Sequence, residues 1–357
     1  MTGTPRATAV RRAPETMSPL QIGLVGCGRV GRNLVRLLAR HESLRLAAIE
    51  EPSEPEAVEY LLRFDTLLGR FPDALTRNEN GLEIAGRQVA LLAPPETGTP
   101  PWRDLGVSVV IEASGRSRTR AELEAHLAAG ARRVVVCSPP AEPPDLTVVA
   151  GVNGGDLESR HRIVSAGSVT ANCVGPVLRL LERSFGVERA FLTTVHAYTS
   201  HLRLADVPTP EWRTGRAAGE NIIPHSTNAD DLLADLLPGL AGRVSGMALH
   251  VPVPNGSVVD LTCWHPRAVT AEEINAAVRA AAEGELAGIL AYETEPIVSS
   301  DVLMTTYSGV FDSLSTLIVA GRVSKTLTFY DNAWGYANRV VDLLRRIAAF
   351  EEEETAA

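Results

Sequence analysis

A glycine-rich segment near the start of the chain limits the possible folds most strongly. The apolar run Ile22–Val25 predicts a strand, and the pattern of Arg29–Arg40 predicts a helix. Between them, Gly26, Gly28 and Gly31 have the spacing G-x-G-x-x-G. Glycines at such a turn let the backbone approach a pyrophosphate, whose charge lies against the free amides of the helix. The segment therefore predicts a dinucleotide-binding unit.

An acidic residue lies where such a unit contacts the adenosine ribose. Glu51 directly follows the second expected strand, Leu44–Ile49, and its neighbour is Glu50. A carboxylate at this place can accept both ribose hydroxyls and repels a 2′-phosphate, so NAD is expected rather than NADP. Glu50 is either a solvated neighbour or shares this role.

The first half of the chain alternates short apolar strands with helical stretches. Beyond Glu51, strands are expected at Ser108–Glu112, Arg133–Cys137 and Leu146–Val149, with a helix at Arg118–Ala129. This order predicts a Rossmann-type, doubly wound α/β domain. Residues 1–19 show no periodicity and predict a disordered N-terminal extension, in which Met17 is an alternative start.

The pattern changes after Ser168. A helix is expected at Thr170–Phe185, and strands rich in β-branched residues follow at Ala190–His196, Gly246–Val253, Ser257–His265 and Thr316–Val323. They predict an α+β domain with a mixed or antiparallel sheet covered on one face. A last amphipathic helix, Trp334–Phe350, precedes an acidic segment, Glu351–Glu354, that is expected to be solvated.

Composition excludes several classes of protein. The formal net charge of -9 argues against a nucleic-acid binder, which needs a basic surface. No apolar run approaches the roughly 18 residues of a membrane span. The cysteines form no CxxC pair, which favours reduced thiols in the cytoplasm. They are Cys27, Cys137, Cys173 and Cys263.

Six segments in order make a family resemblance specific. They are Phe64–Phe71, Glu112–Gly115, Gly151–Asn153, Ser165–Cys173, Thr193–Thr199 and Tyr330–Arg339. On these motifs the chain resembles glyceraldehyde-3-phosphate dehydrogenase from about Gln21 to Ala348. The resemblance implies an NAD-binding domain of residues 20–168 and 333–357 and a catalytic and oligomerisation domain of residues 169–332. It also implies a small-molecule substrate and a homotetramer, in which Tyr198–Gly219 packs across subunits.

The resemblance also assigns the residues around the cofactor. Arg29 and Val30 would line the pyrophosphate and the nicotinamide, and Asn332 would hold the carboxamide with Tyr336 beside it. The residues that face the cofactor from the other strands would be Ser114, Gly115 and Cys137.

The position of the family's nucleophilic cysteine is occupied by Val169. Family chemistry needs a thiolate at the start of a helix, where the helix dipole and a histidine lower its pKa. Valine offers no nucleophile, so the covalent route is closed. Cys173 matches a second, structural cysteine of the family, and its use as a nucleophile would require movement of the helix.

The substrate positions are altered as well. His196 matches the catalytic base, and Thr199 is retained, but His201 and His250 stand where the family has an aspartate and an arginine. At the inorganic-phosphate positions Ser168, Thr170 and Thr227 are kept, and Asn228 replaces a glycine. With His225 as a further candidate, the histidines invite a metal hypothesis. Because no H-x-x-x-H spacing or carboxylate partner accompanies them, no metal is expected, and recognition of a carboxylate or sugar hydroxyl is favoured.

Two functions fit this pattern. The first is a redirected NAD-dependent oxidoreductase, in which His196 acts as acid and base on an alcohol or carbonyl substrate without a thiol. The second is a catalytically silent NAD-binding pseudoenzyme with a scaffold or regulatory role. Unaltered triose-phosphate oxidation would need another nucleophile at position 169.

Overall fold

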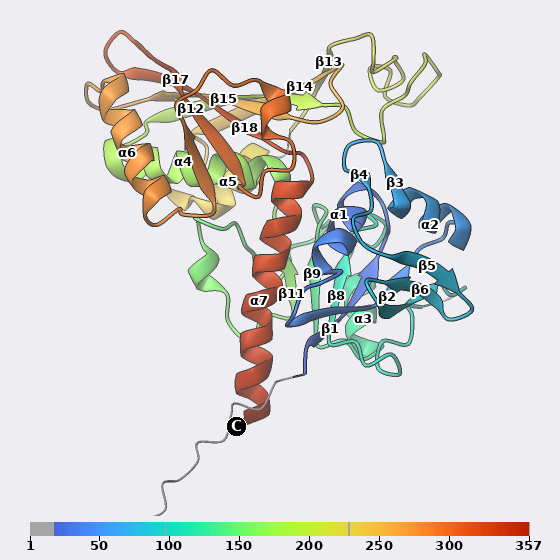
Figure 1. The fold of residues 1–357 in the computed structure, drawn as a ribbon. Helices are drawn as coiled ribbons and strands as arrows, with labels where there is room; N and C mark the ends of the chain where they lie inside the picture. The colour runs from blue at the N-terminus through green and yellow to red at the C-terminus, as the bar shows by residue number, and fades with distance from the viewer. Residues whose placement is uncertain (1–17, 97, 228, 357) are drawn as a thin grey trace, which may run out of the picture.

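The computed structural model describes residues 18–96, 98–227 and 229–356. Figure 1 shows two sheet-containing halves with the helix α7 (Trp334–Ala356) running between them and along the N-terminal half. Most of the predicted N-terminal extension, residues 1–17, lies outside the described residues, as does Asn228.

The N-terminal half is built on a largely parallel sheet. Within the described residues its strand order is β10-β11-β9-β8-β1-β2-β7-β6-β5, and the strands from β10 to β7 pair in parallel. The parallel strands are β1 (Leu20–Val25), β2 (Leu44–Glu50), β7 (Arg87–Leu92), β8 (Val109–Glu112), β9 (Arg133–Val136), β10 (Leu146–Thr147) and β11 (Ile163–Ser165). The predicted doubly wound Rossmann-type sheet is confirmed.

Helices pack on this sheet through a shared apolar core. Leu34 of α1 (Arg29–Leu38) and Val340 of α7 lie in one buried cluster with Ile22 of β1. The remaining elements of this half are α2 (Pro55–Arg63), β3 (Phe64–Asp65), β4 (Gly69–Arg70), α3 (Arg120–Ala128) and the antiparallel edge strands β5 (Leu75–Asn78) and β6 (Gly81–Ile84). Strand β1 therefore leads directly into the loop that precedes α1.

The C-terminal half contains a mixed sheet of order β13-β14-β12-β15-β18-β17-β16. Strand β12 pairs in parallel with β14 and antiparallel with β15, which confirms the predicted mixed architecture. The strands are β12 (Arg189–Ala197), β13 (Ile223–His225), β14 (Val244–Val251), β15 (Ser257–Trp264), β16 (Leu290–Glu293), β17 (Gly309–Val319) and β18 (Val323–Tyr330).

Helices cover one face of the mixed sheet (Figure 1), and they are α4 (Val169–Phe185), α5 (Ala229–Leu236) and α6 (Ala271–Glu283). On β12, Leu192 is buried in the core under these helices, while the preceding Phe191 is 41% exposed. This alternation follows from the two-residue period of a strand. The opposite face is left apolar and open, with Met247, Leu314 and Val319 also exposed.

The expected strand Thr316–Val323 is wrong. It joins the end of β17 to the start of β18 across a hairpin turn. Ala320 and Gly321 have φ angles of 50° and 70°, a left-handed turn conformation that a glycine adopts without strain. The β-branched residues on both sides of this short turn hid it in the sequence.

The expectation that the acidic segment after residue 350 is solvated is wrong for Glu351. Helix α7 continues to Ala356, and Glu351 is only 8% exposed. Its carboxylate pairs with Arg132 at 2.6 Å and with the buried Arg133. These arginines lie far away in the sequence, so local charge pattern gave no sign of them. In the part of the chain that the structure describes, no helix has the length and apolar character needed to cross a membrane.

We expect Glu351→Gln to lower the free energy of unfolding by about 3 kcal/mol, because it removes a carboxylate charge from beside the buried Arg133. Urea unfolding would measure this change. Glu285→Gln is the matched control, because its pair with Arg183 is about half exposed and contributes less than about 1 kcal/mol. Equal losses in the two variants would contradict a buried role for Glu351.

Candidate cofactor and substrate site

The glycine loop forms a cradle at the start of α1. Gly26 has a φ of 92°, and a Cβ there would lie 2.7 Å from the amide nitrogen of Ser114. At Gly31 a Cβ would lie 2.2 Å from the carbonyl oxygen of Gly26, whereas the space beside Gly28 is open. Gly28 is the N-cap of α1, and no side chain caps its amides. Uncapped amides with open space beside them fit a pyrophosphate.

Two acidic residues at the end of β2 have different surroundings. The Oε2 atom of Glu51 accepts a hydrogen bond from the amide of Cys27 at 2.7 Å, and Oε1 accepts one from Ser53 Oγ at 2.8 Å. Each carboxylate oxygen can accept further bonds, so ribose hydroxyls can still be accommodated. Glu50 is 5% exposed and pairs with Arg116 at 2.8 Å. The alternative that Glu50 is a solvated neighbour is therefore wrong.

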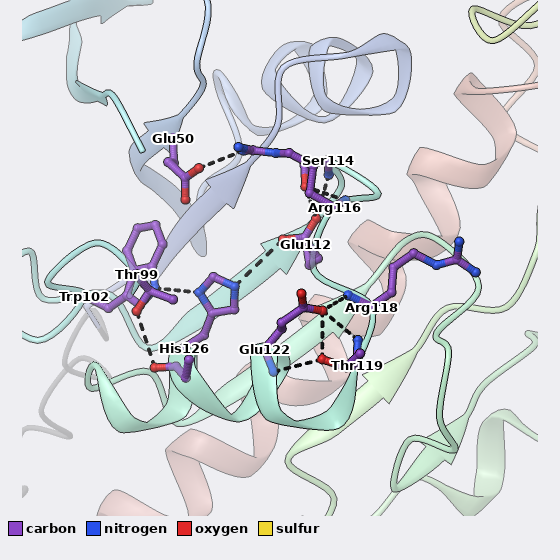
Figure 2. Close-up of polar contacts among 11 residues, drawn as sticks. Glu50, Thr99, Trp102, Glu112, Ser114, Arg116, Arg118, Thr119, Glu122 and His126 are labelled. Carbon is purple, nitrogen blue, oxygen red and sulfur yellow. Dashed lines mark hydrogen bonds and ion pairs between the residues drawn. The ribbon is translucent and has the colours of Figure 1, made fainter. Parts of the chain in front are cut away.

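A polar network that includes the buried Glu50 and Glu112 holds the loop that follows β8. Figure 2 shows it running from Glu50 through Arg116 and Ser114 to Glu112. Glu112 accepts hydrogen bonds from the amide of Ser114 at 2.8 Å and from its hydroxyl at 2.5 Å. Burial raises the pKa of Glu112. Ser114 and the adjacent Gly115, with a φ of 69°, thus lie on a fixed turn beside the glycine loop.

Tyr336 of α7 contacts the segments that follow β9 and β11, behind this loop. Its hydroxyl lies 3.0 Å from the carbonyl oxygen of Cys137 and 3.2 Å from that of Gly167. The ring is buried in the apolar core of the N-terminal half, against which Val30 and Cys137 also pack. Arg29 reaches the other half, where its guanidinium donates to the carbonyl oxygen of Pro254 at 3.4 Å.

The start of α4 carries Val169 as its first residue. Ser168 caps the helix by accepting a hydrogen bond from the amide of Ala171 at 3.1 Å. Val169 packs against the apolar cores of both halves. Thr170 is buried, and its hydroxyl lies 3.3 Å from that of Tyr330. The first position of α4 is therefore occupied by an apolar side chain.

The thiols of the chain lie at other positions than the start of α4. Cys173 is fully buried, and its Sγ lies 3.7 Å from the carbonyl oxygen of Thr328. Burial raises the pKa of Cys173. Burial also raises the pKa to about 12 for Cys27, Cys137 and Cys263. All four cysteines are free, and each is kept as a thiol at neutral pH.

Strand register brings a row of histidines together. His196 on β12 lies beside His250 on the parallel strand β14, with ring centroids 5.0 Å apart. His225 of β13 is 5.6 Å from His250, and His201, in the loop after β12, is 5.9 Å from it. The structure therefore gathers the predicted pocket histidines, including His225. Thr199 joins them through a 2.8 Å contact with Nδ1 of His201.

Three of these histidines, His196, His201 and His250, are neutral at physiological pH. Burial lowers the pKa of His196 to about 4. Burial and the neighbouring imidazoles lower the pKa of His201 and of His250 as well. In residues 18–96, 98–227 and 229–356, no group of three or more His, Cys, Asp or Glu side chains is arranged to hold a metal ion. The cluster thus offers neutral imidazole nitrogens to a ligand.

Asn332 connects the cofactor side with the histidines. Its Oδ1 accepts a hydrogen bond from Ser257 Oγ at 2.8 Å, and its Nδ2 lies 3.3 Å from Nε2 of His196. Asp331, the residue before it, is buried and accepts bonds from the amides of Ala333 and Trp334 at the start of α7. Asn332 is therefore fixed at the junction of the two halves.

The remaining residues of the site include Thr227, which was predicted, and three residues that were not. Thr227 accepts a hydrogen bond from the amide of Ala229 at 3.1 Å, whereas Asn228 lies outside the described residues. Ser257, Asp331 and Arg116 were not predicted as site residues. Asp331 directly precedes Asn332 in a recognised motif and could have been found from it. No local signal marks Ser257, which lies 75 residues from Asn332.

Comparison with known proteins agrees with this geometry. The description "Glyceraldehyde 3-phosphate dehydrogenase, NAD binding domain" matches residues 20–120, and the corresponding C-terminal domain matches residues 168–332. The chain is 40% identical over 331 residues to glyceraldehyde-3-phosphate dehydrogenase of Geobacillus stearothermophilus, covering 92% of this chain and 98% of the relative. It is 41% identical over 332 residues to the enzyme of Mycobacterium leprae, covering 91% and 97%.

The nucleotide-binding sheet, the cradle at α1 and the mixed-sheet half define an NAD-binding protein of the oxidoreductase class. More specifically, the chain belongs to the glyceraldehyde-3-phosphate dehydrogenase family. The predicted family, fold and cofactor are thereby confirmed.

We expect the chain to bind NAD more tightly than NADP, and Glu51→Gln to raise the affinity for NADP about tenfold by removing a negative charge near the 2′ position. Isothermal titration calorimetry would measure both cofactors. Glu54→Gln, a change at an exposed residue at the start of α2, is the control. Equal affinities of the native chain for NAD and NADP would show that Glu51 does not select the cofactor.

The buried thiols predict that iodoacetamide labels the native chain slowly. Val169→Cys would add a thiol at the first position of α4, where the helix dipole lowers its pKa, and this thiol should be alkylated rapidly. Mass spectrometry of peptides would locate the label. Rapid labelling of Cys173 in the native chain would refute its structural role.

Proposed function

We propose that this protein is an NAD-dependent oxidoreductase that transfers hydride without a covalent intermediate. The observation that carries the proposal is the position of His196 beside Asn332, at the junction of the two halves. Bound NAD would take a hydride from the carbon of a secondary or primary alcohol. His196 would take the hydroxyl proton, and in the opposite direction it would return that proton to a carbonyl oxygen.

The state of His196 suits this role. Its Nδ1 lies 2.6 Å from the carbonyl oxygen of Ala197, which can only accept, so Nδ1 carries the proton and Nε2 keeps its lone pair. The low pKa of about 4, caused by burial, keeps the imidazole ring of His196 neutral and able to receive a proton. A base with such a pKa is a weak one. The proposed reaction therefore depends on how readily NAD accepts the hydride.

We further propose a substrate with a polar or acidic group beside the reacting carbon. His201, His225 and His250 would contact that group, because they lie next to His196 and form a row of nitrogen atoms. The substitution of an arginine position by His250 removes a permanent charge and a bidentate clamp for phosphate. A carboxylate or a sugar hydroxyl is therefore a better match than a phosphate ester.

A second candidate is the NAD-binding pseudoenzyme. The contact of Val169 with both apolar cores favours it, because this packing gives the valine a structural role. In this alternative the cofactor cradle serves assembly or regulation, and the histidines bind a ligand that is not converted. The two candidates differ in one observable, the formation of NADH.

We also propose that the chain forms a homotetramer in the cytoplasm and is divided at residues 168/169 and 332/333. The open apolar face of the mixed sheet supports self-association, as do Leu204 and Trp212 in the loop after β12, which are 87% and 89% exposed. Four free cysteines suit a reducing compartment. The division is supported by the start of α4 at Val169 and of α7 at Trp334.

The proposal predicts NADH formation when the native chain is given NAD and a panel of hydroxy acids and sugar alcohols. His196→Gln should lower the rate roughly 10²- to 10⁴-fold while NAD affinity is retained, because only the proton acceptor is lost. Absorbance of NADH would follow the rate, with His161→Gln, near the surface and remote from Asn332, as control. NAD binding without turnover of any panel member would favour the pseudoenzyme instead.

The lowered pKa values of His201 and His250 predict anion binding that strengthens as pH falls. Both rings are neutral at pH 7.5 and become cationic only below their ordinary range near 6.5, so an anion binds together with protons. The affinity for acetate, a carboxylate that stays ionised over this range, should rise about tenfold per pH unit for each proton taken up, as measured by calorimetry on the NAD-saturated protein. His201→Gln should reduce this slope. Glu211, which lies beside His225, repels the anion in the native chain and in the variant alike. A slope of zero would contradict recognition by these histidines.

A further inference from the structure

Ser257 occupies a central position that the family motifs did not mark. It begins β15, is 1% exposed, and lies opposite Tyr330 of β18. Its Oγ accepts a hydrogen bond from the amide of Ala197 at 2.9 Å and lies 2.8 Å from Oδ1 of Asn332. Because an amide oxygen can only accept, the hydroxyl proton of Ser257 is directed to Asn332.

The side chains around Ser257 form a closed ring of hydrogen bonds. With its Oδ1 on Ser257, Asn332 turns Nδ2 toward His196, 3.3 Å from Nε2 and 3.4 Å from Nδ1. The proton of Nδ1 is used on the carbonyl oxygen of Ala197, so Nε2 is the nitrogen that can accept. The ring thus passes from Ala197 to Ser257, Asn332, His196 and back to Ala197, with a donor opposite an acceptor at every step.

The opposite orientation of the Asn332 amide breaks this ring. Oδ1 would then face the lone pair of His196 Nε2, and Nδ2 would displace the proton of Ser257 from Asn332. Ser257 and Asn332 are buried, where an unmatched contact between polar groups is unfavourable. Ser257 therefore decides which end of the amide faces His196.

We propose that Ser257 is a positioning residue that fixes the amide of Asn332 so that the chain presents a hydrogen-bond donor to the cofactor. The inference rests on the proposed place of Asn332 at the nicotinamide. Nδ2 has two hydrogen atoms, of which one faces His196, and the other is free for the carbonyl oxygen of the nicotinamide carboxamide. The same contact supports the Nδ1–H tautomer of His196, and a substrate hydroxyl would replace Nδ2 of Asn332 at Nε2 to give up its proton there.

The experiment compares three ligands by isothermal titration calorimetry. NAD has the full carboxamide, 3-acetylpyridine adenine dinucleotide keeps the carbonyl oxygen but has no NH2 group, and ADP-ribose lacks the ring. The native chain should bind the acetyl analogue within about threefold of NAD, since a donor from Asn332 needs only the carbonyl oxygen. Ser257→Ala should lower the affinity for NAD about three- to tenfold and leave that for ADP-ribose unchanged.

Ser324→Ala is the matched control. Ser324 lies on β18, is fully buried, and contacts His265 at 2.8 Å instead of Asn332. This variant should bind all three ligands as the native chain does. A loss of ADP-ribose affinity in Ser257→Ala would reveal a general structural effect and overturn the positioning role.

Nitrogen-15 NMR gives an independent readout that a structural defect elsewhere would not change. The native spectrum should show His196 as the Nδ1–H tautomer, assigned by its absence in His196→Gln. Ser257→Ala should move the nitrogen-15 shift of Nε2, which loses its donor from Asn332, while Nδ1 keeps the proton that it gives to Ala197. Native binding of the acetyl analogue far weaker than that of NAD would mean that Asn332 presents its oxygen, and would overturn the inference. Absence of NADH formation with the expected ligand ratios would instead refute the proposed reaction and leave the role of Ser257 intact.

Discussion

The register between β12 and its two neighbours is the constraint on which the site depends. Parallel pairing with β14 sets His196 beside His250, and antiparallel pairing with β15 brings Ser257 next to Ala197. A slip of one residue would turn His196 to the face that carries Phe191, away from α4 and Asn332. The buried side of β12, held by Leu192 in the core, prevents this slip.

Burial then decides the chemistry that this register allows. It keeps His196 neutral, with a pKa of about 4, and raises the pKa of the Cys173 thiol. Val169 adds an apolar side chain at the start of α4. The family fold is retained, with its glycine cradle at α1, while His196, His201 and His250 lie together as neutral imidazoles.

The sequence predicted those features that depend on interactions between residues close together in the chain. The turn of Gly26 and Gly28 follows from strand, glycine spacing and helix within one short segment, and the two sheets follow from hydrophobic period. The hairpin turn at Ala320 was missed because β-branched residues surround it. The burial of Glu351 and the contact of Ser257 with Asn332 join residues remote in sequence, and only the folded chain brings them together.

The most direct test is intact-protein mass spectrometry after incubation of the native chain with NAD and glyceraldehyde-3-phosphate. An acyl group retained on a cysteine would add the mass of the substrate residue, since the covalent route passes through a thioester. We predict an unchanged protein mass, because Val169 supplies no nucleophile and Cys173 is buried. An acyl adduct on any cysteine of the native chain would contradict the account.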